Sequence, residues 1–167
     1  MPESAESVIV INTSPLIPLV AAWGDLTRLE ALYQQIWVPF EVSQEILQGG
    51  ATQFAVSEFE QATWLKKQTT PQPISPFLLN TLDLGEASLI QLALDSNLAT
   101  VCLDEAVGRR VARLNGLTLT GSIGILLRAK QQDPALSVKV AIANMLKHNI
   151  LLSQTVITFA LTPAGEQ

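Results

Sequence analysis

Short apolar runs, each followed by polar residues, are the clearest pattern along this chain. Ser7–Ile11 is β-branched and apolar from end to end, which is typical of a strand buried on both faces. We predict strands at 8–11, 36–38, 99–103 and 117–120. Strands that alternate with helices indicate an α/β fold with three layers, in which helices cover both faces of a central, mainly parallel sheet.

Helical periodicity and helix start and stop signals fill the intervening segments. Ser14 is predicted to cap a first helix with Pro15 at its first position. Further helices are expected at 26–34, 40–47, 54–61, 121–130 and 135–147, and on both sides of the strand within Leu82–Ala112.

Two segments allow alternative interpretations. Trp64–Lys67 is either an edge strand or an extension of the preceding helix, and Gln154–Leu161 is either a helix or a strand, with a helix favoured. The proline-rich residues 69–76 predict an internal loop within a single domain that spans 1–167. Residues 1–7 are expected to be flexible.

Composition favours a folded protein of the cytoplasm. A hydrophobic content of 48% and a mean hydropathy of +0.31 argue against disorder. No apolar run reaches the roughly 18–20 residues that cross a bilayer, so no membrane association is expected. The acidic start of the chain is unlike a secretory signal. Cys102 is the only cysteine, which excludes an internal disulfide and fits a reducing compartment.

The charge of the chain argues against tight, non-specific binding of nucleic acid. The net charge is −5 and the isoelectric point is about 4.8, whereas such binding usually requires a basic surface. Five of the ten basic residues nevertheless lie between 109 and 130. Taken alone, this cluster is more typical of solvated helix faces.

Several common sites are excluded by motif. The chain has no glycine-rich dinucleotide motif and no phosphate-binding P-loop. The only histidine, His148, lies in a late amphipathic helix, which gives little support for a nucleophile activated by histidine. Cys102 lies inside an apolar strand, where a core role is far more common than a nucleophilic one.

The remaining candidates for chemistry are acids on three separate segments. Glu45, Glu86 and Asp104 lie where a parallel sheet can bring them together at the carboxyl ends of its strands. Clustered carboxylates repel one another, so such a cluster usually holds a hard divalent cation such as Mg²⁺. A cation held in this way can support hydrolysis of a phosphodiester.

Each acid could also serve the fold alone. Asp104 is a natural cap for the helix that follows it, and Glu86 lies in a first helical turn, where an acid complements the helix dipole. For Glu45, a solvated position on a helix is about as common as a functional one. Glu41 and Glu105 are expected to be surface charges.

The basic and glycine-rich segments beyond Asp104 remain open in the same way. Arg109 is expected either to contact a phosphate or to pair with an acid at the edge of the sheet. Gly121–Gly124 could offer helix N–H groups to a phosphate, although tight packing is the commoner reason for such glycines.

Taken together, five segments resemble the PIN-domain superfamily, and in particular an uncharacterised prokaryotic subfamily related to the VapC toxins of type II toxin–antitoxin pairs. The segments are INTSPLI (11–17), VPFEVSQEI (38–46), LDLGEASLIQLA (82–93), LDEAVGRRVA (103–112) and TGSIGILLRAK (120–130). The resemblance extends over nearly the whole chain, including the closing AGE at 164–166.

The resemblance implies a Rossmann-like α/β/α fold and an Mg²⁺- or Mn²⁺-dependent endoribonuclease. It also implies RNA as the substrate, a homodimer, and an antitoxin protein as partner if the chain is a toxin. Matched to the family's motifs, the catalytic residues are Glu45, Glu86 and Asp104, and the metal ligands are Asn12, Glu86 and Asp104. We assign substrate binding to Ser14, Arg109, Gly121 and Ser122.

Asn12 is where the chain departs from the family's pattern. The family has an aspartate at this position, after the first strand, and an amide supplies only a neutral oxygen. A neutral ligand weakens a site for a hard cation, because the attraction is mainly electrostatic. Two hypotheses follow: a metal-dependent ribonuclease, or a PIN-like module that has lost strong catalysis and acts by binding nucleic acid or protein.

Overall fold

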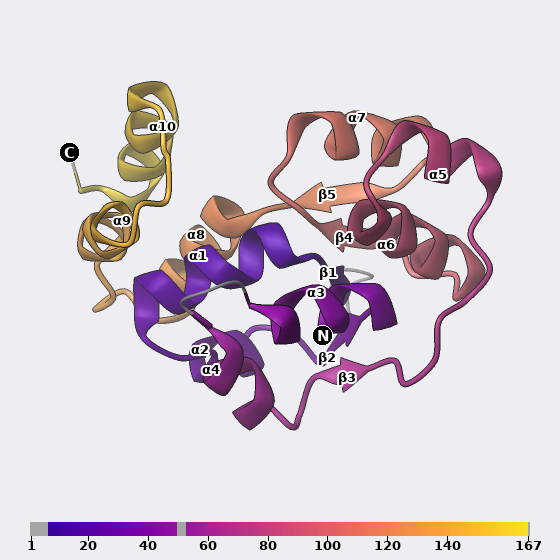
Figure 1. Cartoon of the computed structure of the whole chain (residues 1–167). Helices are drawn as coiled ribbons and strands as arrows, with labels where there is room; N and C mark the ends of the chain where they lie inside the picture. Colours follow the sequence, from indigo (N-terminus) through magenta and orange to yellow (C-terminus); the bar gives the residue numbers. More distant parts are fainter. Residues whose placement is uncertain (1–6, 50–52, 167) are drawn as a thin grey trace.

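A five-stranded sheet forms the centre of the computed structural model, which describes residues 7–49 and 53–166 (Figure 1). The strands are β1 (Val8–Ile11), β2 (Gln35–Val38), β3 (Lys66–Lys67), β4 (Thr100–Cys102) and β5 (Thr118–Thr120). They lie in the order β3-β2-β1-β4-β5, and every pairing is parallel. The four predicted strands are confirmed, and Lys66–Lys67 forms an edge strand.

The helices cover the two faces of this sheet (Figure 1). They are α1 (Thr13–Trp23), α2 (Thr27–Glu30), α3 (Phe40–Gln48), α4 (Val56–Gln61), α5 (Pro76–Thr81), α6 (Leu84–Asp95), α7 (Ala106–Leu114), α8 (Ser122–Gln132), α9 (Val138–Lys147) and α10 (Gln154–Ala164). α10 decides the open question at Gln154–Leu161 in favour of a helix. Within the described residues, no helix is both long and apolar enough to cross a membrane.

Alternation along the central strand divides the core into two parts. Ile9 and Ile11 of β1 pack into a cluster with residues of α1, α3, α8 and α9. Val10 points to the opposite face, into a second cluster with residues of α5, α6 and α7. Because successive side chains of a strand point to opposite faces, both sides of β1 are buried. The three-layer α/β/α architecture expected from the sequence is therefore confirmed.

Three predicted helix starts or lengths differ from the structure. The expected helix 26–34 shrinks to α2, because the backbone N–H of Gln34 already donates to the carbonyl of Ser7 at 2.7 Å and leads into β2. Ser14 does not cap α1, which begins at Thr13 with Asn12 in the capping position. α9 begins at Val138 rather than at residue 135, because the Ser137 hydroxyl caps it there.

The remaining sequence expectations concern connections. Residues 68–75 link β3 to α5 without regular structure, close to the expected loop at 69–76. Strands from both sides of this connection belong to the same sheet. Of residues 1–7, expected to be flexible, all except Ser7 lie outside the described residues.

The C-terminal end of the described chain returns to cap α9. The Glu166 carboxylate accepts hydrogen bonds from the Ser137 hydroxyl at 2.6 Å and from the Val138 N–H at 2.7 Å. Lys130 of α8 lies 3.7 Å from the same carboxylate. Desolvation opposes ionisation of Glu166, but these hydrogen bonds outweigh it and lower the pKa of its carboxyl. The glutamate of the closing AGE segment thus joins α8, α9 and the chain after α10.

Glu166→Gln is expected to destabilise the protein by about 1–2 kcal/mol, because the helix cap and the ion pair lose their charge. A carboxyl with a lowered pKa stabilises the fold above its unfolded pKa of 4.5, and this contribution is lost as the pH falls through the folded value. Urea unfolding at pH 7 and at pH 3 measures the difference. Glu30→Gln, at an exposed acid on α2, is the control. A difference between wild type and Glu166→Gln that is as large at pH 3 as at pH 7 would contradict this assignment.

Candidate metal centre

Three acids meet where α6 and α7 begin, beside the carboxyl ends of β1 and β4. Asp83, Glu86 and Glu105 each have an oxygen within 4.8 Å of an oxygen of the other two. Glu86 is only 4% exposed, whereas Asp83 and Glu105 are exposed. We call these three residues the acid cluster. Carboxylate oxygens at this spacing are ligands that Mg²⁺ and Mn²⁺ prefer.

Local sequence explains why Asp83 and Glu86 lie together. Asp83 is the N-cap of α6, and its Oδ1 accepts a hydrogen bond from the Glu86 N–H at 2.8 Å. An acid followed three residues later by glutamate is a signature of a helix start. Asp83 was not among the site residues predicted from the sequence, although this signature indicates that its side chain lies beside Glu86. The expectation for Glu105 was incomplete, because this exposed acid belongs to the cluster.

Electrostatics within the cluster disfavour a full set of negative charges. Burial raises the pKa of Glu86 to about 8, and hydrogen bonding and charge from Asp83, with a further contribution from Glu105, add to this effect. Glu86 Oε2 is buried without a hydrogen-bond partner. Burial also raises the pKa of Glu45, with additions from the charges of Asp83 and Glu105. A bound divalent cation would satisfy Glu86 Oε2 and offset this repulsion, so the residues fit such an ion.

Asn12 presents its carbonyl oxygen to the same place. Its Nδ2 donates to the Ser14 hydroxyl oxygen at 3.3 Å, which leaves Oδ1 buried and without a partner. Asn12 Oδ1 and Glu45 Oε2 both lie against the backbone of Gly85, at the start of α6. Asn12 and Glu45 therefore lie at the start of α6, beside the residue that precedes Glu86. The catalytic and metal-binding roles predicted for these residues stay predictions.

Three glycines lie where a side chain would collide with the carboxylate of a neighbouring acid. A Cβ at Gly85 would lie 2.8 Å from Glu45 Oε2, and a Cβ at Gly121 would lie 2.5 Å from Asp104 Oδ1. A Cβ at Gly108 would collide with Glu86 Oε2. Real side chains do not approach so closely, so each glycine permits a carboxylate to lie against the backbone. Close packing of this kind, rather than turn geometry, accounts for these three positions.

Asp104 points away from the acid cluster and towards α8. Its Oδ1 accepts from the Ser122 N–H and its Oδ2 from the Ser122 hydroxyl, both at 2.7 Å. The expectation that Asp104 caps the helix after it is wrong, because Glu105 occupies the capping position of α7. Desolvation raises the pKa of the Asp104 carboxyl, although the Ser122 hydrogen bonds and Arg109 act in the opposite direction.

The four residues expected to bind substrate contact other protein groups. The Ser14 hydroxyl oxygen accepts from the Asp104 N–H at 3.1 Å, and Ser122 donates to the Asp104 carboxylate. Arg109 Nη1 donates to the carbonyls of Leu103 and Thr120, at 2.8 and 3.2 Å, and so joins the ends of β4 and β5. Gly121 lies directly against this group. Their binding of substrate stays a prediction.

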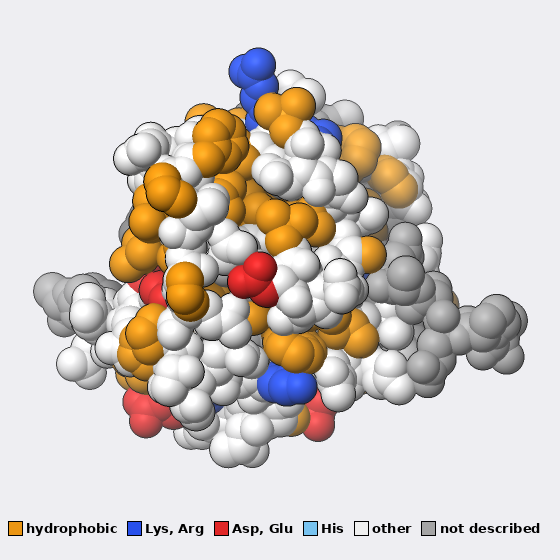
Figure 2. Space-filling model, turned by 90° about the vertical axis from the view of Figure 1, so that its right-hand side faces the viewer, with side chains coloured by type: hydrophobic (Ala, Val, Ile, Leu, Met, Phe, Trp, Pro, Cys, Tyr) orange, Lys and Arg blue, Asp and Glu red, His pale blue; other side chains and the backbone are white. Residues whose placement is uncertain are grey.

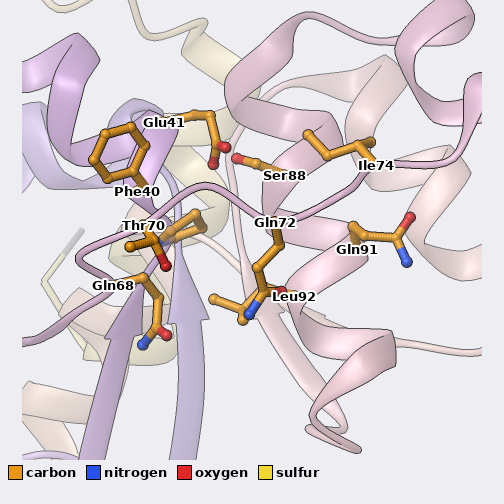
Figure 3. A pocket seen from close by; sticks show the side chains of 10 residues that line it. Phe40, Glu41, Gln68, Thr70, Gln72, Ile74, Ser88, Gln91 and Leu92 are labelled. Atoms are coloured by element: carbon orange, nitrogen blue, oxygen red, sulfur yellow. The ribbon is translucent and has the colours of Figure 1, made fainter.

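The acid cluster opens into a hollow of about 240 Å³ that we call the acid hollow. Its lining includes Asn12, Glu45, Asp83, Glu105 and Ile150. A separate crevice lies between α3, α6 and the 68–75 connection, where Glu41 and Ser88 face each other (Figure 3). That crevice offers about 10 Å³, which is space for one water molecule, so the acid hollow is the better candidate for a substrate site.

Comparisons with known proteins agree with this arrangement. A family model described as "DUF3368: PIN domain" matches residues 8–166. No curated protein and no solved structure gave a significant match. The match includes the sheet, the acid cluster and the capping residue Glu166. The chain therefore belongs to the PIN-domain family.

Proposed function

We propose that this protein is a metal-dependent endoribonuclease that hydrolyses phosphodiester bonds of RNA. The observation that supports it most is Glu86, a buried glutamate with an unpartnered oxygen inside a cluster of acids. An unpaired buried carboxylate is costly unless a cation or a proton compensates it. Membership of the PIN family supports a nuclease-like role for such a site.

The proposed ligands are the acid cluster and the oxygen of Asn12. Asp83, Glu86 and Glu105 supply charged oxygens, and Asn12 Oδ1 supplies a neutral one. Bound here, Mg²⁺ or Mn²⁺ would stabilise negative charge on the phosphate and make an attacking water more acidic. Asp104, expected from the sequence to be a ligand, is proposed instead to position the end of β4 against α8.

Glu45 is the proposed proton acceptor. It lies in the wall of the acid hollow, and its raised pKa brings it closer to neutral pH than an ordinary glutamate. A base works best when its pKa lies near the working pH. In this assignment Glu45 Oε2 takes the proton from the water that attacks phosphorus. Gly85 has no side chain and therefore leaves room for this oxygen.

Asn12 favours a second candidate, a PIN-like module that binds nucleic acid or protein with weak or no catalysis. It removes one negative charge from the oxygen ligands, while its orientation towards Gly85 is kept by Ser14. Restoring the acid with Asn12→Asp separates the two candidates. Cleavage by Asn12→Asp but not by the wild type would favour the binding module.

The central test is cleavage of a labelled single-stranded RNA with Mn²⁺, alongside calorimetry of Mn²⁺ binding. Asp83→Asn is expected to weaken Mn²⁺ binding by about tenfold and to slow cleavage, because one charged ligand becomes neutral. Asp95→Asn, at the other end of α6, makes the same chemical change far from the cluster and should match the wild type. If the wild type neither cleaves RNA nor binds Mn²⁺, the ribonuclease proposal is wrong.

A toxin role, an antitoxin partner and a homodimer are further parts of the proposal that come from the family resemblance. Figure 2 shows hydrophobic side chains spread over the face that lies to the right in Figure 1. Exposed large hydrophobic residues on α5, α6 and α7, the helices of that side, are Phe77, Leu79, Leu84, Leu94, Val107 and Leu114. Exposed apolar patches often mark protein–protein contacts. Light scattering of the purified chain decides between monomer and dimer.

A further inference from the structure

A second hollow adjoins the acid hollow and contains a pair of aromatic rings. It measures about 580 Å³ and is lined by Phe54, Lys147 and His148, among others. Thr13, Ile17 and Glu45 line both hollows, so Glu45 stands at the boundary between them. We call the second one the ring hollow. Its volume is in the range of pockets that hold small organic ligands.

Phe54 and His148 come from distant parts of the chain and pack ring to ring. Their centroids are 5.1 Å apart and the ring planes are inclined by 31°. Phe54 is half-buried against the core, and His148 at the end of α9 is exposed. Together they present an aromatic surface to the hollow, anchored on the phenylalanine side.

Hydrogen bonding orients the histidine. His148 Nδ1 lies 2.9 Å from the carbonyl oxygen of Asn144. A carbonyl only accepts, so Nδ1 carries the hydrogen and Nε2 is left for another partner. Next to the ring, Asn149 adopts a left-handed conformation (φ 63°) and Ile150 follows it into the lining of the acid hollow. The end of α9 therefore connects the two hollows.

The ring hollow differs from a third hollow that also adjoins the acid hollow, with which it shares Ser14, Pro18 and Ile150. That third hollow, of about 650 Å³, is lined by apolar residues such as Leu151, Leu152 and Phe159. Asp104 and the four residues expected to bind substrate, Ser14, Arg109, Gly121 and Ser122, also line it. Its Arg109 donates to backbone carbonyls. The ring hollow instead combines an exposed ammonium group, Lys147, with the two rings. Cation and aromatic surface together suit a nucleotide, whose phosphate is anionic and whose base stacks.

We propose that the ring hollow binds an unpaired nucleotide of the substrate, next to the phosphodiester that is cleaved. The base stacks on the exposed His148 ring, which Phe54 supports from its other side, and Lys147 contacts the phosphate of the same nucleotide. A base paired inside a helix has both faces covered by its neighbours, whereas an unpaired base is free to stack on an aromatic ring. This inference rests on the proposed function and specifies the substrate of the same site.

The test measures binding in EDTA, so that cleavage does not interfere. A short single-stranded RNA carries a fluorescent label for anisotropy, and a second copy carries 2-aminopurine, whose fluorescence falls when it stacks. Phe54→Ala and His148→Ala are each expected to weaken binding by about 5- to 100-fold and to reduce the quenching. Phe54→Tyr should keep both the RNA affinity and the quenching of 2-aminopurine, since it preserves the aromatic ring.

Matched variants control for folding and for charge. Val140→Ala shortens an exposed apolar side chain of α9, and Lys139→Ala removes an exposed lysine at the other end of α9 from Lys147. Both should bind like the wild type. Lys147→Ala should reduce the slope of log affinity against log salt by about 1, as loss of one phosphate contact does. Thermal melting confirms that each variant is folded.

The outcomes separate this inference from the proposed function. If the wild type cleaves RNA with Mn²⁺ but Phe54→Ala and His148→Ala bind as tightly as the wild type, the ring hollow is not a substrate site. Equal affinity for duplex and single strand, without quenching, also overturns it. If the wild type shows neither cleavage nor RNA binding, the proposed function fails as well. Single-stranded DNA of the same sequence tests whether the ribose contributes.

Discussion

Replacing Glu86 with glutamine is expected to abolish RNA cleavage and to weaken Mn²⁺ binding by at least about 100-fold, since even outer residues of metal sites contribute about 10- to 100-fold. Glu86 is the buried member of the acid cluster, so its charge acts on a cation with little screening by water. Calorimetry with Mn²⁺ and the RNA cleavage assay measure both effects.

The same substitution should stabilise the metal-free protein by about 1 kcal/mol or more at pH 8, because a buried charge is removed. With a folded pKa near 8 and an unfolded value of 4.5, the wild-type glutamate costs stability as the pH rises through this window. Glu86→Gln lacks that cost, so its advantage should grow from pH 5 to pH 8.

Glu60→Gln on α4 provides the control, since Glu60 is an exposed acid outside the cluster. It should change neither Mn²⁺ affinity nor the pH dependence of unfolding. A Glu86→Gln protein that is less stable than the wild type at pH 8, yet binds Mn²⁺ normally, would show that this carboxylate serves the fold and not a metal.

The neighbouring acids Asp104 and Glu105 are expected to have opposite roles. Asp104→Asn should leave Mn²⁺ binding at the wild-type level, because Ser122 binds the Asp104 carboxylate away from the acid cluster. Glu105→Gln should weaken Mn²⁺ binding by about tenfold with little effect on stability, because its exposed carboxylate belongs to the acid cluster. Urea unfolding and calorimetry of both variants give the comparison.

Each of these two variants is the control for the other, because the substitutions are chemically alike and lie one residue apart. Ser122→Ala should destabilise the fold by about 1–3 kcal/mol, since it removes the hydroxyl that donates to the Asp104 carboxylate. If Asp104→Asn instead lowers Mn²⁺ affinity more than Glu105→Gln does, Asp104 is a ligand and our assignment must be reversed.

The sequence was sufficient for the fold because its two central strands, β1 and β4, are buried on both faces. An uninterrupted β-branched run as short as Val8–Ile11 strongly favours a buried strand over a helix, and the helices between the strands follow from periodicity. The helix expected at 26–34 failed because apolar residues at helical spacing, such as Leu29 and Leu32, also bury in a short turn that leads into a strand.

Strand ends and family motifs predict which residues lie near the candidate site, but they do not predict where the side chains point. Asn12, Glu45 and Glu86 lie at one edge of the sheet because parallel strands bring their carboxyl ends together there, whereas the roles of these residues stay predictions. Asp104 and Glu105 follow the same strand, and only side-chain direction separates them. Asp104 bonds to Ser122, a partner 18 residues away that no local pattern indicates.

The glycines at 85, 108 and 121 give a rule for reading other sequences of this type. A chain that keeps the acids but carries alanine or serine at these positions is expected to fold and yet have displaced carboxylates, because a single Cβ takes the space that each needs. A search for the acids alone would then count such inactive chains as active. The room for each carboxylate depends on how closely the nearby backbone approaches it: α6 at Glu45, α7 at Glu86 and the start of α8 at Asp104. Backbone spacing at this site is thus as informative as the acids themselves for deciding which homologous chains retain the chemistry.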